Sequence, residues 1–397
     1  MQGAASGLAG ATLGFAAMAD QVLIYADTVK SPELRHEIPL TVPDPFLYAE
    51  VDGTRLVLTH VLEAKRMDEL GIGLELHMSE EFGIDDLIAE GRKQDEIRNE
   101  IVLRAVRAFG LDDAVTPFWF PLQLADFLRG NGVKLRADRE FFAKRRRVKT
   151  EAELEGIRRA QKAAEAGMAA ARDLLRQASP NGEALLLDGE PLTSERLKLA
   201  ITQAFTERDC GAEDSIVAHG PQGAVGHDMG SGPIALGEPV VIDLWPRDRE
   251  SGCFADMTRT FVVGDPPPEI AEWHGLVLES LERSLDAVKA GVKGRAVYDV
   301  SCEVFEERGH PTQRTKEKGK PLHDGFFHGL GHGVGLEVHE EPGLGIIGQK
   351  ELLAGDVVTI EPGLYRQGFG GVRLEDLVLV TDDGAENLTD FPYDLAP

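Results

Sequence analysis

Acidic residues begin or end several apolar segments whose composition is that of buried strands. The segments read VVID, ADMTRTF, VVTIEPG and GVRLED, and the acids in question are Asp243, Asp256, Glu361 and Glu375. In the last segment, the two-residue period of a strand places Arg373 and Glu375 on the same face. An isolated acid at a strand end is most often a surface residue, so only the recurrence of the pattern indicates a site.

Four carboxylates that met in a partly buried site would need to be neutralised. Burying each of them costs several kcal/mol unless it is protonated or lies beside a cation. Two divalent cations would offset the four negative charges. Oxygen ligands with one imidazole suit Mn²⁺, with Co²⁺, Fe²⁺ or Zn²⁺ as alternatives. Paired ions generate a hydroxide nucleophile near neutral pH and polarise a carbonyl or phosphoryl group, so the pattern predicts a two-metal hydrolase.

Histidines gather in the glycine-rich segment FHGLGHGVGLEVHE, which contains His328, His332 and His339. Glycines allow the backbone to approach a ligand closely, and three histidines among them favour a functional role. The segment is not an H-E-x-x-H zinc motif, because the Glu is absent. It is not a dinucleotide-binding G-x-G-x-x-G motif either, because the third glycine is replaced and no strand leads into it.

Composition excludes several classes of protein. The chain has 397 residues, of which 42% are hydrophobic and 28% charged, as is typical of a folded protein with two or three domains. Its 42 basic and 68 acidic residues give a net charge of −26, which repels phosphate backbones and argues against a nucleic-acid partner. No apolar run reaches the roughly 18 residues that span a bilayer, so no membrane partner is expected.

The cysteines and the amino terminus bear on the cellular compartment. The cysteines are widely spaced and lack a C-x-x-C motif, which predicts reduced thiols and a cytoplasmic location; they are Cys210, Cys253 and Cys302. Residues 1–17 are uncharged: either the chain starts at Met1, or it starts at Met18 and residues 1–17 are a non-native or upstream extension. A signal peptide is the alternative, but no Lys or Arg precedes Lys30, so the basic n-region is missing.

A mixed α/β architecture is expected along the chain. Residues 18–143 are interpreted as an amino-terminal domain of short strands and helices, with a strand at 55–59 and a helix at 84–109. The basic residues 144–149 are expected to form a solvated linker. A capping box, Thr150 with Glu153, begins a long helix that reaches about Gln177 and opens the second domain, 150–397. Further helices are predicted at 194–208, 268–289 and 296–308, and strands at 239–244, 255–263, 357–361 and 371–381.

These residues, in this order, resemble the pita-bread metallopeptidases. Five of them, each inside its own motif, match the family's metal ligands: Asp243, Asp256, His332, Glu361 and Glu375. The resemblance covers residues 150–381 and is closest to the aminopeptidase P and prolidase branch, the Xaa-Pro peptidases. His328, four residues before His332, and the preceding domain both favour this branch. The resemblance implies a pita-bread catalytic domain behind a smaller creatinase/prolidase-type amino-terminal α/β domain.

A role for each ligand follows from the resemblance. Asp243 would bind one divalent ion, Asp256 and Glu375 would bridge two ions, and His332 and Glu361 would complete the second site. A hydroxide that bridges the ions would attack the peptide carbonyl, and Glu361 or a neighbouring acid would pass a proton to the leaving nitrogen.

The resemblance also assigns residues around the substrate. His227 would approach the substrate from the side opposite the metals. His328 and His339 would line the pocket and steady the tetrahedral intermediate, with His339 stabilising the oxyanion. Arg373 would hold the ligand shell and bound substrate from beside Glu375.

The function implied is hydrolysis of Xaa-Pro bonds in small peptides by a cytoplasmic enzyme, with a homodimer as its assembly. One alternative is a peptidase of the same metal type without a proline preference. A second is a metal-free, creatinase-like C–N hydrolase, and a third is a non-catalytic binding module. Members of the last two kinds tend to lose the metal ligands, whereas all five stand here. Whether the substrate is a dipeptide or a longer peptide stays open.

Two features depart from the family pattern. The interval between Asp243 and Asp256, through Trp245 to Glu250, is about two residues longer than usual. It is expected in a hairpin beside the metals, where it would reshape the pocket and weaken the specificity for proline. His219 stands where a small residue is expected, so it is a weak site candidate, with an exposed loop histidine as the alternative.

Overall fold

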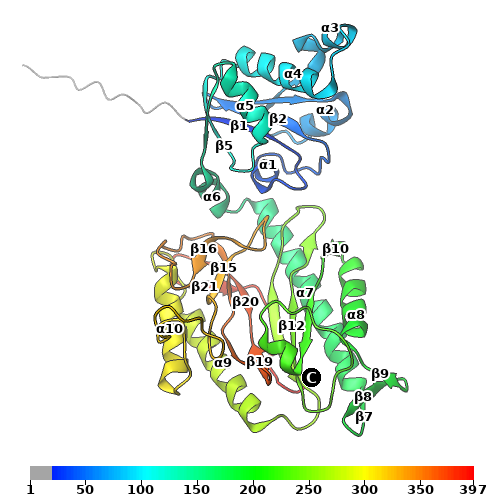
Figure 1. Ribbon diagram of the computed structural model, residues 1–397, viewed down its shortest axis with the longest axis vertical. Helices are drawn as coiled ribbons and strands as arrows, with labels where there is room; N and C mark the ends of the chain where they lie inside the picture. The colour runs from blue at the N-terminus through cyan, green and yellow to red at the C-terminus, as the bar shows by residue number, and fades with distance from the viewer. Residues whose placement is uncertain (1–19) are drawn as a thin grey trace, which may run out of the picture. The chain divides into compact units, whose positions relative to one another are not determined.

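A computed structural model describes residues 20–397 (Figure 1). The expected extension 1–17 and the start at Met18 lie outside the described residues. The chain forms two compact units. The first comprises the residues up to Leu34 together with Val42–Arg139, and the second comprises Arg35–Thr41 together with Glu140–Pro397.

The first unit is built on a six-stranded mixed sheet in the order β4-β3-β2-β1-β5-β6. The central strands β1, β2 and β3 pair antiparallel, and the pairs β1–β5, β3–β4 and β5–β6 are parallel. The strands are β1 (Gln21–Ala26), β2 (Phe46–Val51), β3 (Thr54–Thr59), β4 (Leu74–Met78), β5 (Asp113–Thr116) and β6 (Lys134–Ala137).

Helices α4 and α5 lie over this sheet (Figure 1) and bury Ile101 and Leu124 against Leu23. The helix predicted at 84–109 is two helices, α3 and α4, because Gly91 between them has a φ of 71° and turns the chain. The helical elements of this part are α1 (Pro32–Glu37), α2 (Val61–Asp68), η1 (Ser79–Phe82), α3 (Ile84–Ala89), α4 (Gln94–Ala108) and α5 (Leu122–Gly130).

One half of the second unit packs helices α7 and α8 on the antiparallel sheet β11-β12-β14. Thr150 caps α7, and Glu153 returns the bond to the Thr150 N–H, as the capping box predicts. The elements are α7 (Glu151–Gln177), β7 (Ser179–Asn181), β8 (Ala184–Leu187), β9 (Glu190–Pro191), α8 (Ser194–Thr206), β10 (Cys210–Gly211), β11 (Ile216–His219), η2 (Gly220–Ala224), β12 (Pro239–Leu244), β13 (Arg247–Asp248) and β14 (Met257–Val262).

The other half packs helices α9 and α10 on the antiparallel sheet β16-β15-β17-β20-β21. In Figure 1 these two helices and α7 with α8 flank the strands from opposite sides. The elements are α9 (Pro268–Ala287), α10 (Gly294–Glu307), β15 (Gly331–Gly333), β16 (Glu340–Leu344), β17 (Val357–Ile360), β18 (Gly363–Arg366), β19 (Gly370–Arg373), β20 (Asp376–Val380) and β21 (Ala385–Asn387).

The strand predicted at 371–381 is interrupted where the two halves meet. Its first part, β19, pairs with β18, whereas β20 pairs with β17 and β21. At the break, the Glu375 N–H donates to the carbonyl of Thr258 in β14 at 3.0 Å. Glu375 therefore stands at the junction of the half-sheets and not on the face of one continuous strand.

The basic residues 144–149 do not form a solvated linker. Residues 144–147 complete helix α6 (Arg139–Arg147), and the side chains of Arg146 and Arg147 are 9% exposed. Arg147 forms two hydrogen bonds with the buried Asp356, at 3.0 and 2.5 Å. The run of basic residues indicated a solvated segment, because the acidic residues that pair with it are far away in the sequence.

Candidate metal centre

One cavity of about 840 Å³ in the second unit is lined by all the predicted site residues except the weak candidate His219. These residues come from strands and loops of both halves: His227, Asp243, Asp256, His328, His332, His339, Glu361, Arg373 and Glu375. The fold therefore gathers motifs that are far apart in the sequence around a single space.

Each predicted metal ligand lies within or directly beside a short strand. Asp243 lies in β12, and Asp256 immediately precedes β14. His332 is the middle residue of β15, and Glu361 follows β17. Glu375 occupies the break between β19 and β20. The apolar neighbours pack into the cores, which leaves the polar side chains at the sheet junction.

Three of these side chains form a group that could hold an ion. Ligand atoms of Asp256, His332 and Glu375 all lie within 4.8 Å of one another. His332 Nε2 lies 3.8 Å from Asp256 Oδ2 and 3.5 Å from Glu361 Oε1, which is too far for good hydrogen bonds. Asp256 Oδ1 is buried and has no hydrogen-bond partner among the described residues. Such an orphaned carboxylate oxygen among other acids is what a bound cation would satisfy.

Burial and crowding of like charges keep protons on the acids. Burial, followed by the charges of Glu375, Asp243 and Glu361, raises the pKa of Asp256 well above its usual range. Burial and the charges of Glu361 and Asp243 raise the pKa of Glu375, and burial raises the pKa of Glu361 to about 8. Burial lowers the pKa of His332 to about 3, so the imidazole is neutral, the form that binds metals. Divalent cations would displace the carboxyl protons.

Arg373 orients two of the acids through hydrogen bonds. Its Nη2 donates to Asp243 Oδ2 at 2.5 Å, and its Nε donates to Thr258 Oγ1 at 3.2 Å. The Thr258 hydroxyl in turn donates to Glu375 Oε2 at 2.7 Å. One guanidinium therefore holds one predicted ligand directly and another through a single hydroxyl.

Tyr365 belongs to this network, although the sequence analysis did not identify it. Its hydroxyl accepts from Arg373 Nη1 at 3.1 Å and lies 2.9 Å from His328 Nε2. His328 Nδ1 lies 2.7 Å from the Gly329 carbonyl, which can only accept, so Nδ1 carries the proton and Nε2 accepts from Tyr365. His328 is thus held in one tautomer. A tyrosine four residues after Glu361 gave no signal, because tyrosines in strands are usually core residues.

His339 and His227 differ from His328, since neither ring makes a hydrogen bond within residues 20–397. The His339 ring packs edge-on against His332, with centroids 4.2 Å apart. Burial lowers the pKa of His339, so its ring is neutral near pH 7. His227 is exposed on the loop between η2 and β12. Both rings line the cavity and are available to a ligand.

The longer interval after Asp243 forms an anchored hairpin. Arg247 and Asp248 form β13, which pairs with β10. The Asp248 carboxylate accepts from Arg159 at 2.9 and 2.8 Å, and this ties the hairpin to α7. Trp245 lines the cavity, so the hairpin contributes an aromatic side chain to its wall.

His219 is neither a site residue nor an exposed loop residue. It is 8% exposed, lies in β11, and does not line the cavity. Its Nδ1 lies 2.8 Å from Glu238 Oε2, and its Nε2 lies 3.1 Å from the Ser231 carbonyl. Both ring nitrogens are used to hold the loop before β12, which is a structural role.

The sequence pattern of metallopeptidase family M24 matches residues 155–382, which is more than half of the chain. The chain belongs to metallopeptidase family M24. The Xaa-Pro dipeptidases of Pyrococcus furiosus and Pyrococcus horikoshii are 39% and 36% identical to this M24 member, each over 179 residues. These alignments cover 45% of the chain and 47% of each relative, so the chain spans about half the length of the curated relatives it matches.

Solved structures extend the likeness over nearly the whole chain. The prolidase from P. horikoshii OT3 superposes with a TM-score of 0.73 at 25% identity and covers 95% of both chains. The prolidase from P. furiosus gives 0.72 at 25% identity and covers 94% of this chain and 97% of its own. The expected fold class and the resemblance to the aminopeptidase P and prolidase branch are confirmed.

The donor set of this M24 member fits divalent cations. It combines four carboxylates, one neutral imidazole and an unpartnered buried oxygen, all around one cavity. Oxygen-rich sets with an imidazole suit Mn²⁺ and its neighbours in the first transition row. Across residues 20–397, no helix has the length and apolar character required to cross a membrane.

Proposed function

We propose that this M24 member is a dinuclear metal-dependent peptidase that hydrolyses Xaa-Pro bonds in small peptides. The observation that carries the proposal is the convergence of four carboxylates and His332 on a cavity in which Asp256 Oδ1 lacks a partner. The printed names of the relatives, Xaa-Pro dipeptidase and prolidase, support the bond and the substrate class.

Two divalent ions would be held by the five ligands. Asp243 would help to hold one ion and His332 with Glu361 the other, and the resemblance assigns Asp256 and Glu375 to both. Mn²⁺ suits this set best, with Co²⁺, Fe²⁺ and Zn²⁺ as alternatives. When bound, such ions supply a water-derived nucleophile at neutral pH and polarise the substrate carbonyl.

The protein's own groups orient this centre and handle protons. Arg373 and Thr258 hold Asp243 and Glu375 in fixed orientations, which keeps the ligand shell preorganised. His339 donates a hydrogen bond to the carbonyl oxygen as negative charge develops there, and His227 contacts the substrate from the opposite wall. A Glu361 carboxylate oxygen takes the proton of the nucleophile and delivers it to the leaving nitrogen.

The wall of the cavity suits a small, partly apolar substrate. Val225, Met229, Trp245 and Phe327 line it beside the polar groups, and they offer an apolar surface to a proline ring. The volume of about 840 Å³ lies in the range of small-ligand sites, roughly 300–1,000 Å³. The three buried free cysteines favour a reducing compartment, and we assign the chain to the cytoplasm.

An M24 peptidase without a proline preference is the second candidate. The observation that favours it is the anchored hairpin that carries Trp245 into the cavity wall, because the family's fold and ligands do not determine specificity. A metal-free creatinase-like hydrolase and a non-catalytic binding module are disfavoured, because all five ligand side chains line the cavity.

The test is hydrolysis of a matched set, Xaa-Pro, Xaa-Pro-Yaa and Xaa-Ala-Yaa, by one Mn²⁺-loaded preparation whose bound metal is counted. We expect two ions per chain and cleavage of the proline peptides, with Asp256→Asn as the inactive control. The ratio of dipeptide to tripeptide cleavage separates a prolidase from an aminopeptidase P. One ion or none contradicts the dinuclear centre, and equal cleavage of the alanine peptide selects the second candidate.

A further inference from the structure

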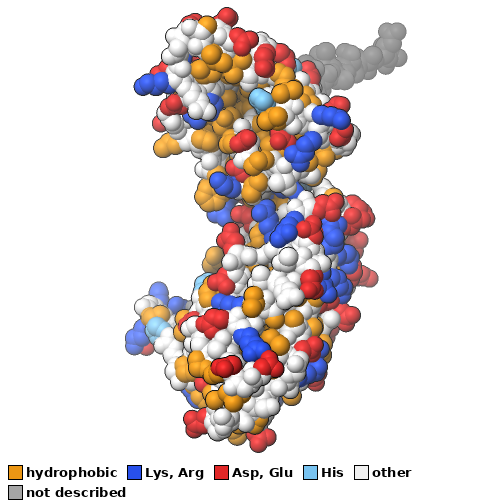
Figure 2. Space-filling model, turned by 90° about the vertical axis from the view of Figure 1, so that its right-hand side faces the viewer, with side chains coloured by type: hydrophobic (Ala, Val, Ile, Leu, Met, Phe, Trp, Pro, Cys, Tyr) orange, Lys and Arg blue, Asp and Glu red, His pale blue; other side chains and the backbone are white. Residues whose placement is uncertain are grey.

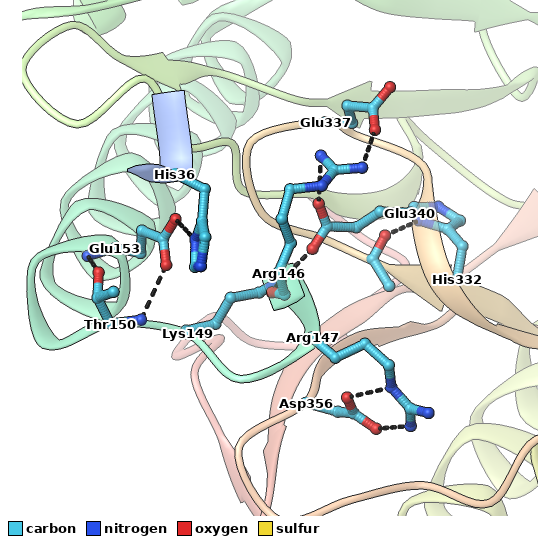
Figure 3. Close-up of polar contacts among 11 residues, drawn as sticks. His36, Arg146, Arg147, Lys149, Thr150, Glu153, His332, Glu337, Glu340 and Asp356 are labelled. Atoms are coloured by element: carbon cyan, nitrogen blue, oxygen red, sulfur yellow. Dashed lines mark hydrogen bonds and ion pairs between the residues drawn. The ribbon is translucent and has the colours of Figure 1, made fainter. Parts of the chain in front are cut away.

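The basic segment around α6 forms ion pairs with the acidic residues on either side of His339. Arg146 Nη2 donates to Glu337 Oε2 at 2.6 Å, and its Nη1 donates to Glu340 Oε2 at 3.4 Å. The Lys149 ammonium donates to the other Glu340 oxygen, Oε1. Figure 3 shows Arg146 between the two carboxylates, with His332 beside them. Two cations therefore hold both flanks of His339.

The ion pairs of Arg146 and Lys149 are buried. The side chains of Lys149 and Glu340 are each 4% exposed, and that of Arg146 is 9% exposed. Lys149 Nζ also donates to the Arg146 carbonyl at 2.8 Å, so its position is determined by two partners. A buried charge left without its partner is strongly unfavourable, so these groups must stay together.

A glycine makes the close approach possible. A Cβ atom added at Gly335 would lie 2.5 Å from Glu340 Oε1 and 2.7 Å from Lys149 Nζ. The ion pair therefore packs directly on the backbone of the segment that leads to His339. A side chain at this position would require the Glu340 carboxylate and the Lys149 ammonium to shift.

The His339 ring contacts His332, and the residue after it pairs with Gly333. Strand β15 ends at Gly333 and β16 begins at Glu340, so His339 is outside regular strand pairing. The segment is tied at its start, where Val334 N donates to the Val357 carbonyl at 2.9 Å and Phe254 N donates to the Gly335 carbonyl at 2.8 Å. Beyond that point the segment is held by the buried Leu336, by the pairing of Glu340 with Gly333, and by the ion pairs of Glu337 and Glu340.

We propose that Arg146 and Lys149 are positioning residues for His339 and act through Glu337 and Glu340. The catalytic consequence rests on the proposed function, in which His339 stabilises the oxyanion. The basic segment holds the ring at the distance and angle that this hydrogen bond requires, and small displacements of such a group slow catalysis strongly.

Residues 35–41 and α6, where the chain enters the second unit, are bonded to each other and to the start of α7. Arg145 Nε donates to Glu37 Oε1 at 2.8 Å, which links α6 to residues 35–41. From the same short segment, His36 Nδ1 lies 2.9 Å from Glu153 Oε1 (Figure 3), and Glu153 caps α7 just after Lys149. The ion pairs beside His339 are thus continuous with the contacts that join residues 35–41, α6 and the start of α7 in the second unit.

The test compares Lys149→Met with Lys144→Met in the Mn²⁺-loaded full chain. Lys144 is a matched control, because it belongs to the same basic segment but is 68% exposed, and among residues 20–397 it pairs with Glu140 on its own helix. We expect Lys149→Met to lower kcat about 10- to 100-fold with KM within about twofold, because the contact acts in the transition state. Lys144→Met leaves both constants unchanged. Equal constants for the two variants overturn the proposal.

A double-mutant cycle separates positioning from general weakening. In a His339→Ala background, Lys149→Met should have no further effect on kcat, because the group that it positions is gone. Additive losses would show that Lys149 acts elsewhere and would overturn the proposal. The number of bound ions should stay the same in Lys149→Met, since His332 is held by β15. A loss of metal would mean that the segment supports the metal centre and not His339.

Hydrogen–deuterium exchange of the metal-free chain tests the anchor without any activity. Peptides that cover residues 334–340 should exchange faster in Lys149→Met than in Lys144→Met, and unchanged exchange contradicts the anchor. If Lys149→Met fails to fold, Glu337→Gln replaces it, because Glu337 is 35% exposed and its loss is tolerated more easily. If no peptide is cleaved by the wild type, the proposed function fails, while the exchange result still decides whether the anchor exists.

Discussion

At the scale of single residues, the acids of the cavity are held in a state that calls for cations. Asp256, Glu361 and Glu375 all have raised pKa values because they are buried beside one another. Arg373 offsets only part of this charge through its contact with Asp243. A folded chain without metal must therefore keep protons that its unfolded state would release.

The stability of the metal-free chain should fall as the pH rises above about 7. Burial raises the pKa of Glu361 from 4.5 to about 8, so the folded state binds a proton that the unfolded state loses between these values. The stabilisation is fully present below about pH 4.5 and is lost as the pH rises through about 8. Asp256 and Glu375 shift in the same direction.

Thermal unfolding in chelator measures this effect. We expect a lower midpoint at about pH 9 than at about pH 7.5, a range above the ordinary pKa of histidine in which the buried neutral histidines add no opposing slope, with a smaller difference in Glu361→Gln and after addition of Mn²⁺. A midpoint that stays level or rises over this range in the metal-free wild type would contradict the protonated site.

At the scale of elements, the junction of the two half-sheets rests on Arg259. Its side chain is 1% exposed and pairs with the buried Asp376 at 2.9 Å. Its Nη1 also donates to the carbonyls of Thr258 and Glu375 at 2.9 and 2.8 Å. This arginine therefore ties β14 to the segment that carries one of the predicted ligands.

Replacing Arg259 with Met should destabilise the protein by about 3–5 kcal/mol, because it leaves the carboxylate of Asp376 buried without its cation. Arg158→Met is the matched control, since that arginine pairs with Glu386 while 46% exposed, and its loss should cost less than about 1 kcal/mol. Urea unfolding of both variants gives the comparison. Similar free energies of unfolding for the two would show that the junction does not depend on Arg259.

At the scale of the whole molecule, the net charge of −26 is spread over two units. Figure 2 shows acidic and basic side chains mixed over the face that it displays, a pattern that favours solubility over binding of a polyanion. Large apolar side chains are also exposed, among them Trp119 at 62% and Leu122 at 72% in the first unit. Exposed apolar surface of this kind is often covered by association.

A homodimer is the expected assembly. Light scattering after gel filtration should give about 86 kDa, twice the chain mass of 43.2 kDa. Trp119→Ser should shift the mass toward that of one chain if the apolar surface of the first unit contributes to the interface. A wild-type mass near that of a single chain would contradict the dimer.

The sequence by itself determined the residue types at the centre and the elements beside them. Asp243, Asp256 and Glu361 could be singled out because an acid next to an apolar strand is anomalous in a local window. The capping box at Thr150 located the start of α7 because it too is a local feature, whose hydrogen bonds join residues three apart. The family resemblance placed these motifs in one fold.

Only the tertiary structure decided what depends on distant partners. Lys149 and Glu340 are 191 residues apart, so the sequence indicated solvated charges, whereas the fold buries the two side chains together. Tyr365 and His328 are 37 residues apart, and only their contact shows which tautomer the histidine adopts. Periodicity and composition report local preferences, whereas ion pairs and hydrogen bonds in a core depend on which segments the packing brings side by side.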